Sequence, residues 1–396
     1  MRRVETMRWA IIDDGVNLAI PAIVQNIEID RLGIVKNRTP ALAFNHATIC
    51  FKIIQNYAHT LFDAVSIKIL DDDTHRANKD ALIAAFRWCM ENDIQLIHMS
   101  IGTTEPHDGE AIREMIGRLV EQGIVIVAAN SNKGVQTYPA YDNRVIGVEC
   151  DDMLEGDQFV YTPNALTGIM FRASARHRLK ESRFGITSPS NSFAAPLITA
   201  QLLLLAEYEK ALSHDRAMKW LREHAVRTDE SVFFTTPRGQ DGAVVIAFLC
   251  LDKFKTQVLM TELKSLFMQD GYTCVLAAPP DFSLPDAVVI PTHLAPKHYL
   301  HWAVRFFPCE VLLVALTEND MSGLGAQIDL IVTDELTNAD GKHPPDHDAI
   351  AICTESGGTV RKACDIYQEM INILSEEETS MEVMDNRIDQ AVCPSE

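Results

Sequence analysis

The chain has 396 residues, of which 47% are hydrophobic, so it can bury a sizeable core in one large domain or in two domains. Its net charge is −20 at pH 7, and residues 241–396 hold only 9 Lys and Arg against 25 Asp and Glu. This acidic balance argues against nucleic-acid binding and favours basic partners. No segment approaches about 20 uninterrupted apolar residues, so no membrane span is expected.

The N-terminal residues and the cysteines indicate the compartment. The first residues, MRRVETMRWAII, place two arginines before an apolar stretch that is too short for a signal peptide. The nine cysteines form no C-x-x-C pair and have no zinc-like spacing to histidine, so we expect buried free thiols in a reducing compartment. These features predict a cytoplasmic protein.

Short apolar runs alternate with amphipathic stretches over residues 1–225. Two of these stretches, 78–93 and 108–123, have apolar residues at i, i+3, i+4 and i+7, which is typical of helices. Alternation of helices with almost continuously apolar strands predicts an α/β fold, a parallel sheet with helices on both faces. The expected buried strands are residues 7–12, 64–70, 94–100, 123–129 and 144–150.

A polar stretch at residues 227–242 interrupts this alternation and is predicted to link two domains. The first domain would span residues 1–226, and a second, smaller and acidic α/β domain would span residues 243–378. Residues 379–396 form an acidic tail that we expect to be disordered.

The second domain weakly resembles a degenerate P-loop domain. Lys255 and Thr256 stand where a strand meets a helix, as in a P-loop, but the glycines that let a loop surround phosphates are missing. A module for docking a protein partner, self-association or substrate capture is therefore favoured over nucleotide binding.

Four polar residues of the first domain stand where one cleft can collect them. Asp13 ends the first strand before a glycine turn, His46 and Ser192 each begin an apolar helix, and Asn132 follows a buried strand. Ligand sites of open α/β sheets lie at the carboxyl ends of strands and the adjoining helix N-termini. A serine hydroxyl needs a base to take its proton, imidazole titrates near neutrality, and a carboxylate fixes the imidazole tautomer. Each of the four is also compatible with an ordinary turn or capping role.

Five segments of residues 5–215 resemble, in family order, the motifs of the subtilisin-like serine peptidases, or subtilases. The family triad runs in the order Asp, His, Ser. The resemblance therefore implies a subtilisin-like parallel sheet and peptidase activity. The matching segments are IIDDGV, NHATICFKII, IQLIHMSIGT, VIVAANSNKG and SNSFAAP.

The resemblance also implies a role for each side chain. His46 would be the general base, Asp13 the residue that orients it, and Ser192 the nucleophile that forms an acyl-enzyme. Asn132 would donate to the oxyanion, together with the backbone N–H at the nucleophile. Three residues would pair with the backbone of a peptide or protein substrate: Ser100, Ile101 and Gly102.

The segments depart from the family pattern beside the reacting groups. Ala47 stands in place of a glycine after the base, and Ser190 and Asn191 replace Gly and Thr before the nucleophile. Asn130 and Ser131 replace Ala and Gly before the oxyanion residue. No reacting group is lost, so we predict an active peptidase. The alternative is an inactive relative that binds a peptide or serves in assembly.

The first residues bear on how such a protease would be restrained. Asp13 lies so close to Met1 that no inhibitory propeptide precedes it if Met1 is the natural start, and an unsecreted protease then needs narrow specificity. We therefore predict a cytoplasmic processing endopeptidase that acts on one or a few peptides, for example on the leader of a ribosomally made peptide. No cofactor is expected. A solvated turn is favoured at Asp71–Asp73, with structural calcium as the alternative, and Asp14 is expected to be solvated, with a substrate contact as the alternative.

Overall fold

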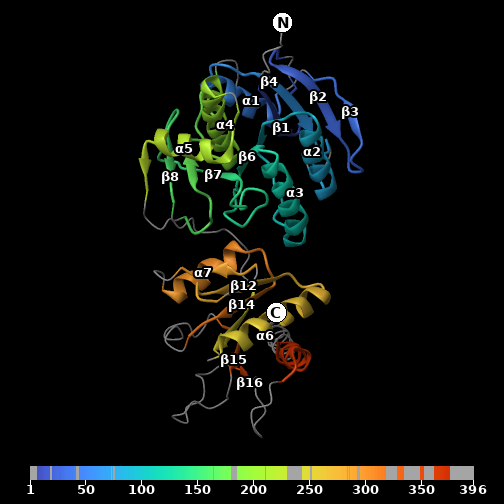
Figure 1. The fold of residues 1–396 in the computed structure, drawn as a ribbon, viewed down its shortest axis with the longest axis vertical. Coiled ribbons are helices and arrows are strands. Elements are labelled where there is room, and N and C mark those ends of the chain that lie inside the picture. Colours follow the sequence, from blue (N-terminus) through green and yellow to red (C-terminus); the bar gives the residue numbers. More distant parts are fainter. Residues whose placement is uncertain are drawn as a thin grey trace, which may run out of the picture. The chain divides into compact units, whose positions relative to one another are not determined.

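The structure, a computed structural model, divides into two compact units, Met1–Arg238 and Gly239–Glu396 (Figure 1). It describes residues 7–17, 20–41, 44–72, 74, 76–163, 165–179, 185–209, 211–229, 243–249, 252–282, 284, 286–291, 295–317, 328–333, 348–351 and 361–374. The predicted tail, 379–396, and most of the predicted linker therefore lie outside the described residues.

The first unit is built on a ten-stranded sheet in the order β10-β8-β9-β7-β6-β5-β1-β4-β2-β3. Its central strands pair in parallel from β4 through β1, β5 and β6 to β7. They coincide with the predicted apolar runs, so the parallel core of the sheet is confirmed. The central strands are β1 (Arg8–Asp13), β4 (Asp63–Lys68), β5 (Leu96–Met99), β6 (Val125–Ala129) and β7 (Ile146–Cys150).

The two edges of this sheet were not predicted. β2 (Ile23–Ile29) pairs with β3 (Val35–Asn37), and β8 (Phe159–Tyr161) pairs with β9 (Phe171–Ala173), both antiparallel. These strands are short or only partly buried, so they lack a continuous apolar run. β10 (Arg227–Thr228) pairs with β8 in parallel, which extends the sheet into the first two residues of the predicted linker.

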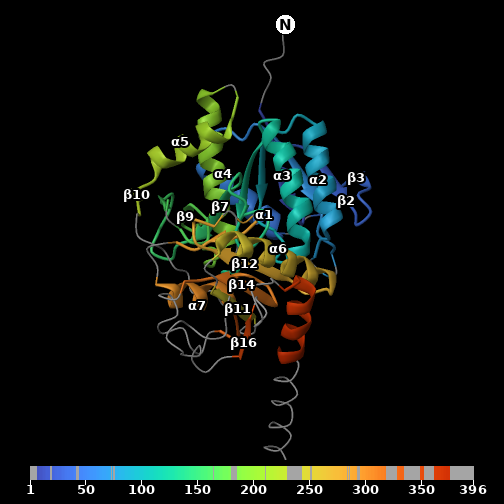
Figure 2. The ribbon, with the colours of Figure 1, turned by 60° about the horizontal axis from the view of Figure 1, so that its bottom comes forward.

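Helices cover both faces of this sheet (Figures 1 and 2). Buried residues of α1, α4 and α5 form one core with alternate strand residues such as Trp9 and Ile11, and those of α2 and α3 form a second core with Ala10 and Ile12. Alternate residues of one strand thus supply both cores, as a sheet covered on two sides requires. The helices are α1 (His46–Tyr57), α2 (Lys79–Glu91), η1 (Pro106–Asp108), α3 (Gly109–Glu121), α4 (Asn191–Tyr208) and α5 (His214–His224).

The second unit is a separate parallel α/β sheet with its own core. Its described residues form six strands in the order β13-β12-β14-β11-β15-β16, and every pair among them is parallel. Residues 363–374 are also helical. The other elements are β11 (Val244–Leu249), α6 (Lys253–Gln269), β12 (Cys274–Ala278), β13 (Val288–Val289), α7 (Pro296–Phe306), β14 (Val311–Ala315), β15 (Leu330–Thr333) and β16 (Asp348–Ala351).

The junction that resembles a P-loop is occupied by the chain itself. The Asp252 carboxylate caps α6 and accepts hydrogen bonds from the N–H groups of Phe254 and Lys255, both at 3.1 Å. The Thr256 hydroxyl donates to the Asp252 carbonyl at 2.9 Å. A carboxylate therefore takes the N–H groups that a phosphate would need.

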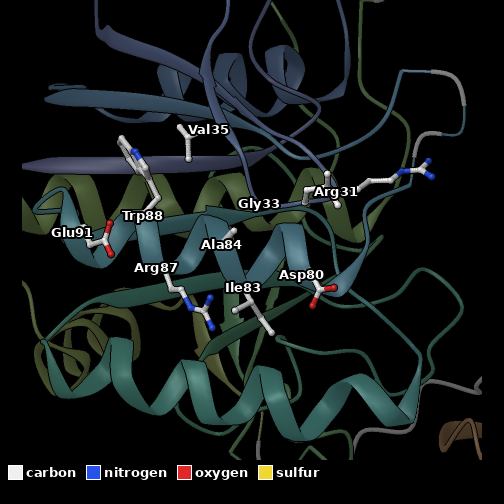
Figure 3. A pocket seen from close by; sticks show the side chains of 10 residues that line it. Arg31, Gly33, Val35, Asp80, Ile83, Ala84, Arg87, Trp88 and Glu91 are labelled. Carbon is white, nitrogen blue, oxygen red and sulfur yellow. The ribbon is translucent and has the colours of Figure 1, made fainter.

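An open groove of about 570 Å³ lies between the β2–β3 hairpin and α2 (Figure 3). Arg31 and Val35 line it from the hairpin, and Arg87 and Trp88 line it from α2. None of the predicted site residues is among those that line it. Among the described residues, no helix is both long enough and apolar enough to cross a lipid bilayer.

Candidate active site

The end of β1 and the start of α1 bring Asp13 and His46 into contact. Asp13 is fully buried, and its Oδ2 accepts a hydrogen bond from Nδ1 of His46 at 2.9 Å. With the Nδ1 proton held by a carboxylate, Nε2 of a neutral imidazole carries a free lone pair. His46 is the first residue of α1, and its side chain remains 33% exposed.

Asp14 caps the helix that carries His46. Its carboxylate accepts from the backbone N–H of His46 at 3.1 Å and from that of Ala47 at 2.8 Å. The expectation that Asp14 is solvated is wrong, because both oxygens bond to the helix N-terminus and the residue is half-buried. Burial and the Asp13 charge raise the pKa of Asp14, while these N–H groups lower it. Ala47 is helical and buried, so it needs no glycine conformation.

The charges around His46 favour its protonated form. Burial lowers the pKa of His46, but the charge and hydrogen bond of Asp13 and the charge of Asp14 more than offset this, so its pKa is raised. The ring of Phe193 stacks on the imidazole, with centroids 5.5 Å apart. The charges of Asp13 and Asp14 therefore stabilise the protonated form of His46, whose ring also stacks on Phe193.

The first turn of α4 lies against α1 and places Ser192 near His46. The thiol of Cys50, one turn after His46, donates to the Ser192 carbonyl at 3.4 Å, and Phe193 makes the ring contact with His46. The Ser192 hydroxyl donates to the carbonyl of Ser100 at 3.5 Å rather than to the imidazole. Catalytic hydrogen bonds are often long or misaligned without substrate. The two groups are thus neighbours whose mutual hydrogen bond is not formed in this structure.

Asn132 is fixed by the start of α4. Its Oδ1 accepts from the backbone N–H of Asn191 at 2.8 Å and from the Ser190 hydroxyl at 3.3 Å. Because an N–H group needs an acceptor, these contacts identify the oxygen of the amide. The amide Nδ2 must then point the other way, and the exposed residue can offer it to a ligand.

The two unusual residues before Ser192 have structural explanations. Asn191 is buried, accepts from the Cys150 N–H at 2.8 Å and donates to the Ser131 carbonyl at 2.9 Å, so it ties α4 to the turn that carries Asn132. Ser190 has φ −161°, an extended conformation open to any residue. The departures from the family pattern therefore leave the backbone unstrained.

The segment after β5, residues 100–102, contacts Ser192 through hydrogen bonds of Ser100. A Cβ at Gly102 would come within 2.7 Å of the Tyr138 carbonyl oxygen, so only glycine fits there. Thr103 and Tyr138 form a bridge that holds the end of the segment. Within the described residues, the backbone N–H and C=O groups of Ile101 and Gly102 form no hydrogen bond. They therefore remain available to an extended peptide.

The turn for which calcium is the alternative to solvation contains paired carboxylates. Asp71 accepts from the Thr74 backbone N–H at 3.0 Å and lies 3.4 Å from Arg31, and Asp72 lies 2.6 Å from Lys68. Asp73 lies outside the described residues. A different set of possible metal ligands, Asp13, His46 and Cys50, has its donor atoms within 4.8 Å of one another.

The capping role of Asp14 was not predicted from the sequence, and two further contributors to the site were missed. Asp14 caps a helix that begins 32 residues later, so no local pattern marks it. His98 is fully buried in β5 beneath Ser100, and its one available signal was a polar residue in an apolar strand. Glu149 is 3% exposed in β7, and its Oε1 accepts from Asn130 at 2.7 Å. Burial raises the pKa of Glu149 to about 7, although Asn130 and the Arg172 charge lower it.

Comparison with known proteins identifies relatives of part of this chain. The minor extracellular protease Epr of Bacillus subtilis strain 168 is 24% identical over 166 residues, which are 41% of this chain and 25% of that protein. Subtilisin DY of Bacillus licheniformis is 22% identical over 175 residues, which are 43% of this chain and 63% of that protein. The chain thus spans less than two thirds of either relative. No protein-family model matches it.

Solved structures give the same kind of match. A lanthipeptide protease is 16% identical with a TM-score of 0.44, covering 56% of this chain and 80% of that one. A cold-adapted subtilisin-like serine proteinase is 16% identical with a TM-score of 0.41, covering 55% of this chain and 81% of that one. From its sequence relatives, the chain contains a subtilase-like region, and the matches to them cover 41% and 43% of its length.

Proposed function

We propose that the chain is a serine endopeptidase that cleaves peptide bonds through Ser192, His46 and Asp13, with Asn132 as an oxyanion donor. The observation that carries the proposal is the 2.9 Å hydrogen bond between His46 Nδ1 and the buried Asp13 carboxylate, beside the helix start that bears Ser192. Such a carboxylate fixes the imidazole tautomer and stabilises the imidazolium that forms when the serine is deprotonated.

The proposed reaction follows from these positions. Rotation of the Ser192 hydroxyl away from the Ser100 carbonyl lets His46 Nε2 take its proton while Oγ attacks the scissile carbonyl. The oxyanion accepts from Asn132 Nδ2 and the Ser192 backbone N–H. His46 then protonates the leaving amine, and a water activated by the same imidazole hydrolyses the acyl-enzyme.

We place the substrate backbone along Ser100, Ile101 and Gly102. The unpaired backbone groups of Ile101 and Gly102 support an extended peptide that adds as a strand, and its main-chain hydrogen bonds do not depend on side chains. The ring of Phe193 stacks on that of His46 with centroids 5.5 Å apart, and an aromatic side chain beside the general base supports a selective site. We therefore propose a processing protease that acts on one or a few peptides in the cytoplasm, for example by removing a leader segment.

Labelling with a fluorophosphonate tests the proposed nucleophile, because this probe phosphonylates an activated serine. The full-length protein should be labelled once per chain, and Ser192→Ala should lose the label while its circular dichroism spectrum and melting temperature stay unchanged. Ser190→Ala, two residues away on the same helix start, is the matched control and should keep the label.

The narrow specificity has its own test. Purified protein should leave casein largely intact, and extensive degradation of casein would contradict a processing role. Absence of labelling in folded protein would instead favour the second candidate, a catalytically inactive protein that binds peptides in the same cleft.

A further inference from the structure

Ser192 has a backbone carbonyl that its own helix cannot satisfy. In an α-helix the carbonyl of residue i accepts from the N–H of residue i+4. For Ser192 that residue is Pro196, inside α4, which has no N–H. A buried carbonyl left without a donor is costly, so another group must supply one.

Ser100 supplies this donor and holds Ser192 at two points. Its hydroxyl donates to the Ser192 carbonyl at 2.9 Å, and its own carbonyl accepts from the Ser192 hydroxyl at 3.5 Å. The Cys50 thiol gives a second, weaker contact to the Ser192 carbonyl at 3.4 Å. Burial and the Asp13 charge raise the pKa of Cys50, so the thiol keeps its proton.

The single hydroxyl proton of Ser100 determines the tautomer of the neighbouring His98. His98 Nε2 lies 3.1 Å from Ser100 Oγ, and His98 Nδ1 lies 2.8 Å from the Thr199 hydroxyl. Ser100 Oγ lies closer to the Ser192 carbonyl, at 2.9 Å, than to Nε2, so we assign its proton to that carbonyl, which cannot donate. Nε2 then carries the ring proton and donates to Oγ, which the Cys50 thiol also approaches at 3.5 Å. The Thr199 hydroxyl lies closer to Nδ1, at 2.8 Å, than to the Ala195 carbonyl, at 3.3 Å, so we assign its proton to Nδ1. All the donors in this chain point the same way, from Thr199 through His98 and Ser100 to Ser192.

His98 can link Thr199 and Ser100 by hydrogen bonds because its imidazole stays neutral. It is fully buried, and burial lowers its pKa to about 3, although the Asp13 charge opposes this. A neutral imidazole has one donor and one acceptor nitrogen, which is what a one-directional chain needs.

We propose that His98 is a positioning residue for the nucleophile: through the Ser100 hydroxyl it fixes the Ser192 carbonyl that Pro196 leaves without a helical donor. The inference rests on the proposed function, and it deepens it by assigning a role to a side chain that touches neither substrate nor His46. Loss of this chain of hydrogen bonds should loosen the first turn of α4 and slow the chemical step while leaving substrate binding intact.

Inactivation kinetics with a fluorophosphonate test this role in the full-length protein. His98→Phe keeps an aromatic ring but has no ring donor, so it should lower the maximal inactivation rate constant by about 10-fold to 100-fold with an unchanged inhibitor constant. His98→Gln, whose amide can donate from a position like that of Nε2, should recover most of the rate. Ser100→Ala should match His98→Phe, and the double variant should be no slower than either single one, because both break one chain.

Two results would overturn the proposal. One is a His98→Phe protein that is inactivated at the wild-type rate. The other is a His98→Gln protein as slow as His98→Phe, which would indicate that the ring acts only by packing.

The tautomer of His98 is measured independently of activity. Long-range ¹H–¹⁵N correlation spectra of the Ser192→Ala protein should show the His98 proton on Nε2, and a proton on Nδ1 would overturn the chain. If wild-type protein is not labelled while Nε2 carries the proton, the proposed function fails and the hydrogen-bond chain stands. These two failures are therefore distinguishable, even where His98→Phe does not fold.

Discussion

The fully buried carboxylate of Asp13 accepts a hydrogen bond from Nδ1 of His46 at 2.9 Å. Asp13→Asn should keep the shape of this contact but remove the charge that stabilises the imidazolium, and it allows the wrong tautomer. We expect the rate of fluorophosphonate labelling to fall by about 10⁴-fold, as for the corresponding change in a known triad.

Asp14→Asn is the control for this variant, since it removes a carboxylate that bonds to the helix backbone rather than to the imidazole. It should reduce labelling far less than Asp13→Asn does. Equal losses in the two variants would contradict a separate orienting role for Asp13.

The pH dependence of labelling follows from the raised pKa of His46. The general base must be neutral to take a proton, so labelling should rise with pH through the His46 pKa, and its midpoint should lie above the ordinary value of 6.5. Because the Asp14 charge helps to raise this pKa, Asp14→Asn should move the midpoint to lower pH. A wild-type midpoint below 6.5 would contradict the electrostatic description of the site.

Two substitutions of Asn132 separate its two functional groups. Asn132→Asp keeps the oxygen that accepts from the Asn191 N–H but loses the Nδ2 donor, and Asn132→Ala loses both. If Nδ2 stabilises the oxyanion, both variants should slow labelling by about 10²-fold to 10³-fold. A nearly unaffected Asn132→Asp protein would show that the amide serves only to cap α4.

The parallel sheet and the positions of Asp13 and His46 could be predicted because each depends on local signals. A buried parallel strand is a continuous apolar run, and ligand-binding side chains collect where such strands end. The strands at the sheet edges could not be predicted, because they lack a continuous apolar run of strand length. All three residues of β3 are exposed, and β8 and β9 have only three residues each.

The supporting contacts were beyond sequence reasoning because they join distant segments. Asn191 looked like an anomaly until its side chain was seen to bridge Cys150 and Ser131. The Ser192 carbonyl is unusual because of Pro196, which is visible in the sequence, but its donor, Ser100, lies 92 residues away. Patterns predict elements, whereas such hydrogen bonds depend on how the elements pack.

Gly102→Ala tests the segment that we assign to the substrate backbone. The added Cβ would come within 2.7 Å of the Tyr138 carbonyl and 2.6 Å of Thr137 Cγ2, so the segment must shift. We expect a weaker inhibitor constant for a peptide-based phosphonate, with a smaller effect on a simple alkyl fluorophosphonate that makes no strand contacts. Equal effects on both probes would indicate a general distortion of the site.

Glu149 makes the stability of the first unit depend on pH. Its pKa is raised from 4.5 to about 7, so between these values the folded state binds more protons than the unfolded state, and the free energy of unfolding falls as pH rises. Glu149→Gln keeps an acceptor for the Asn130 amide without a titrating group. Relative to wild type, its free energy of unfolding should therefore increase by about 3 kcal/mol between pH 4.5 and pH 7. Urea unfolding across this range measures the difference. Glu155→Gln, at an exposed position, should follow the wild-type profile, and parallel profiles for Glu149→Gln and wild type would contradict the raised pKa.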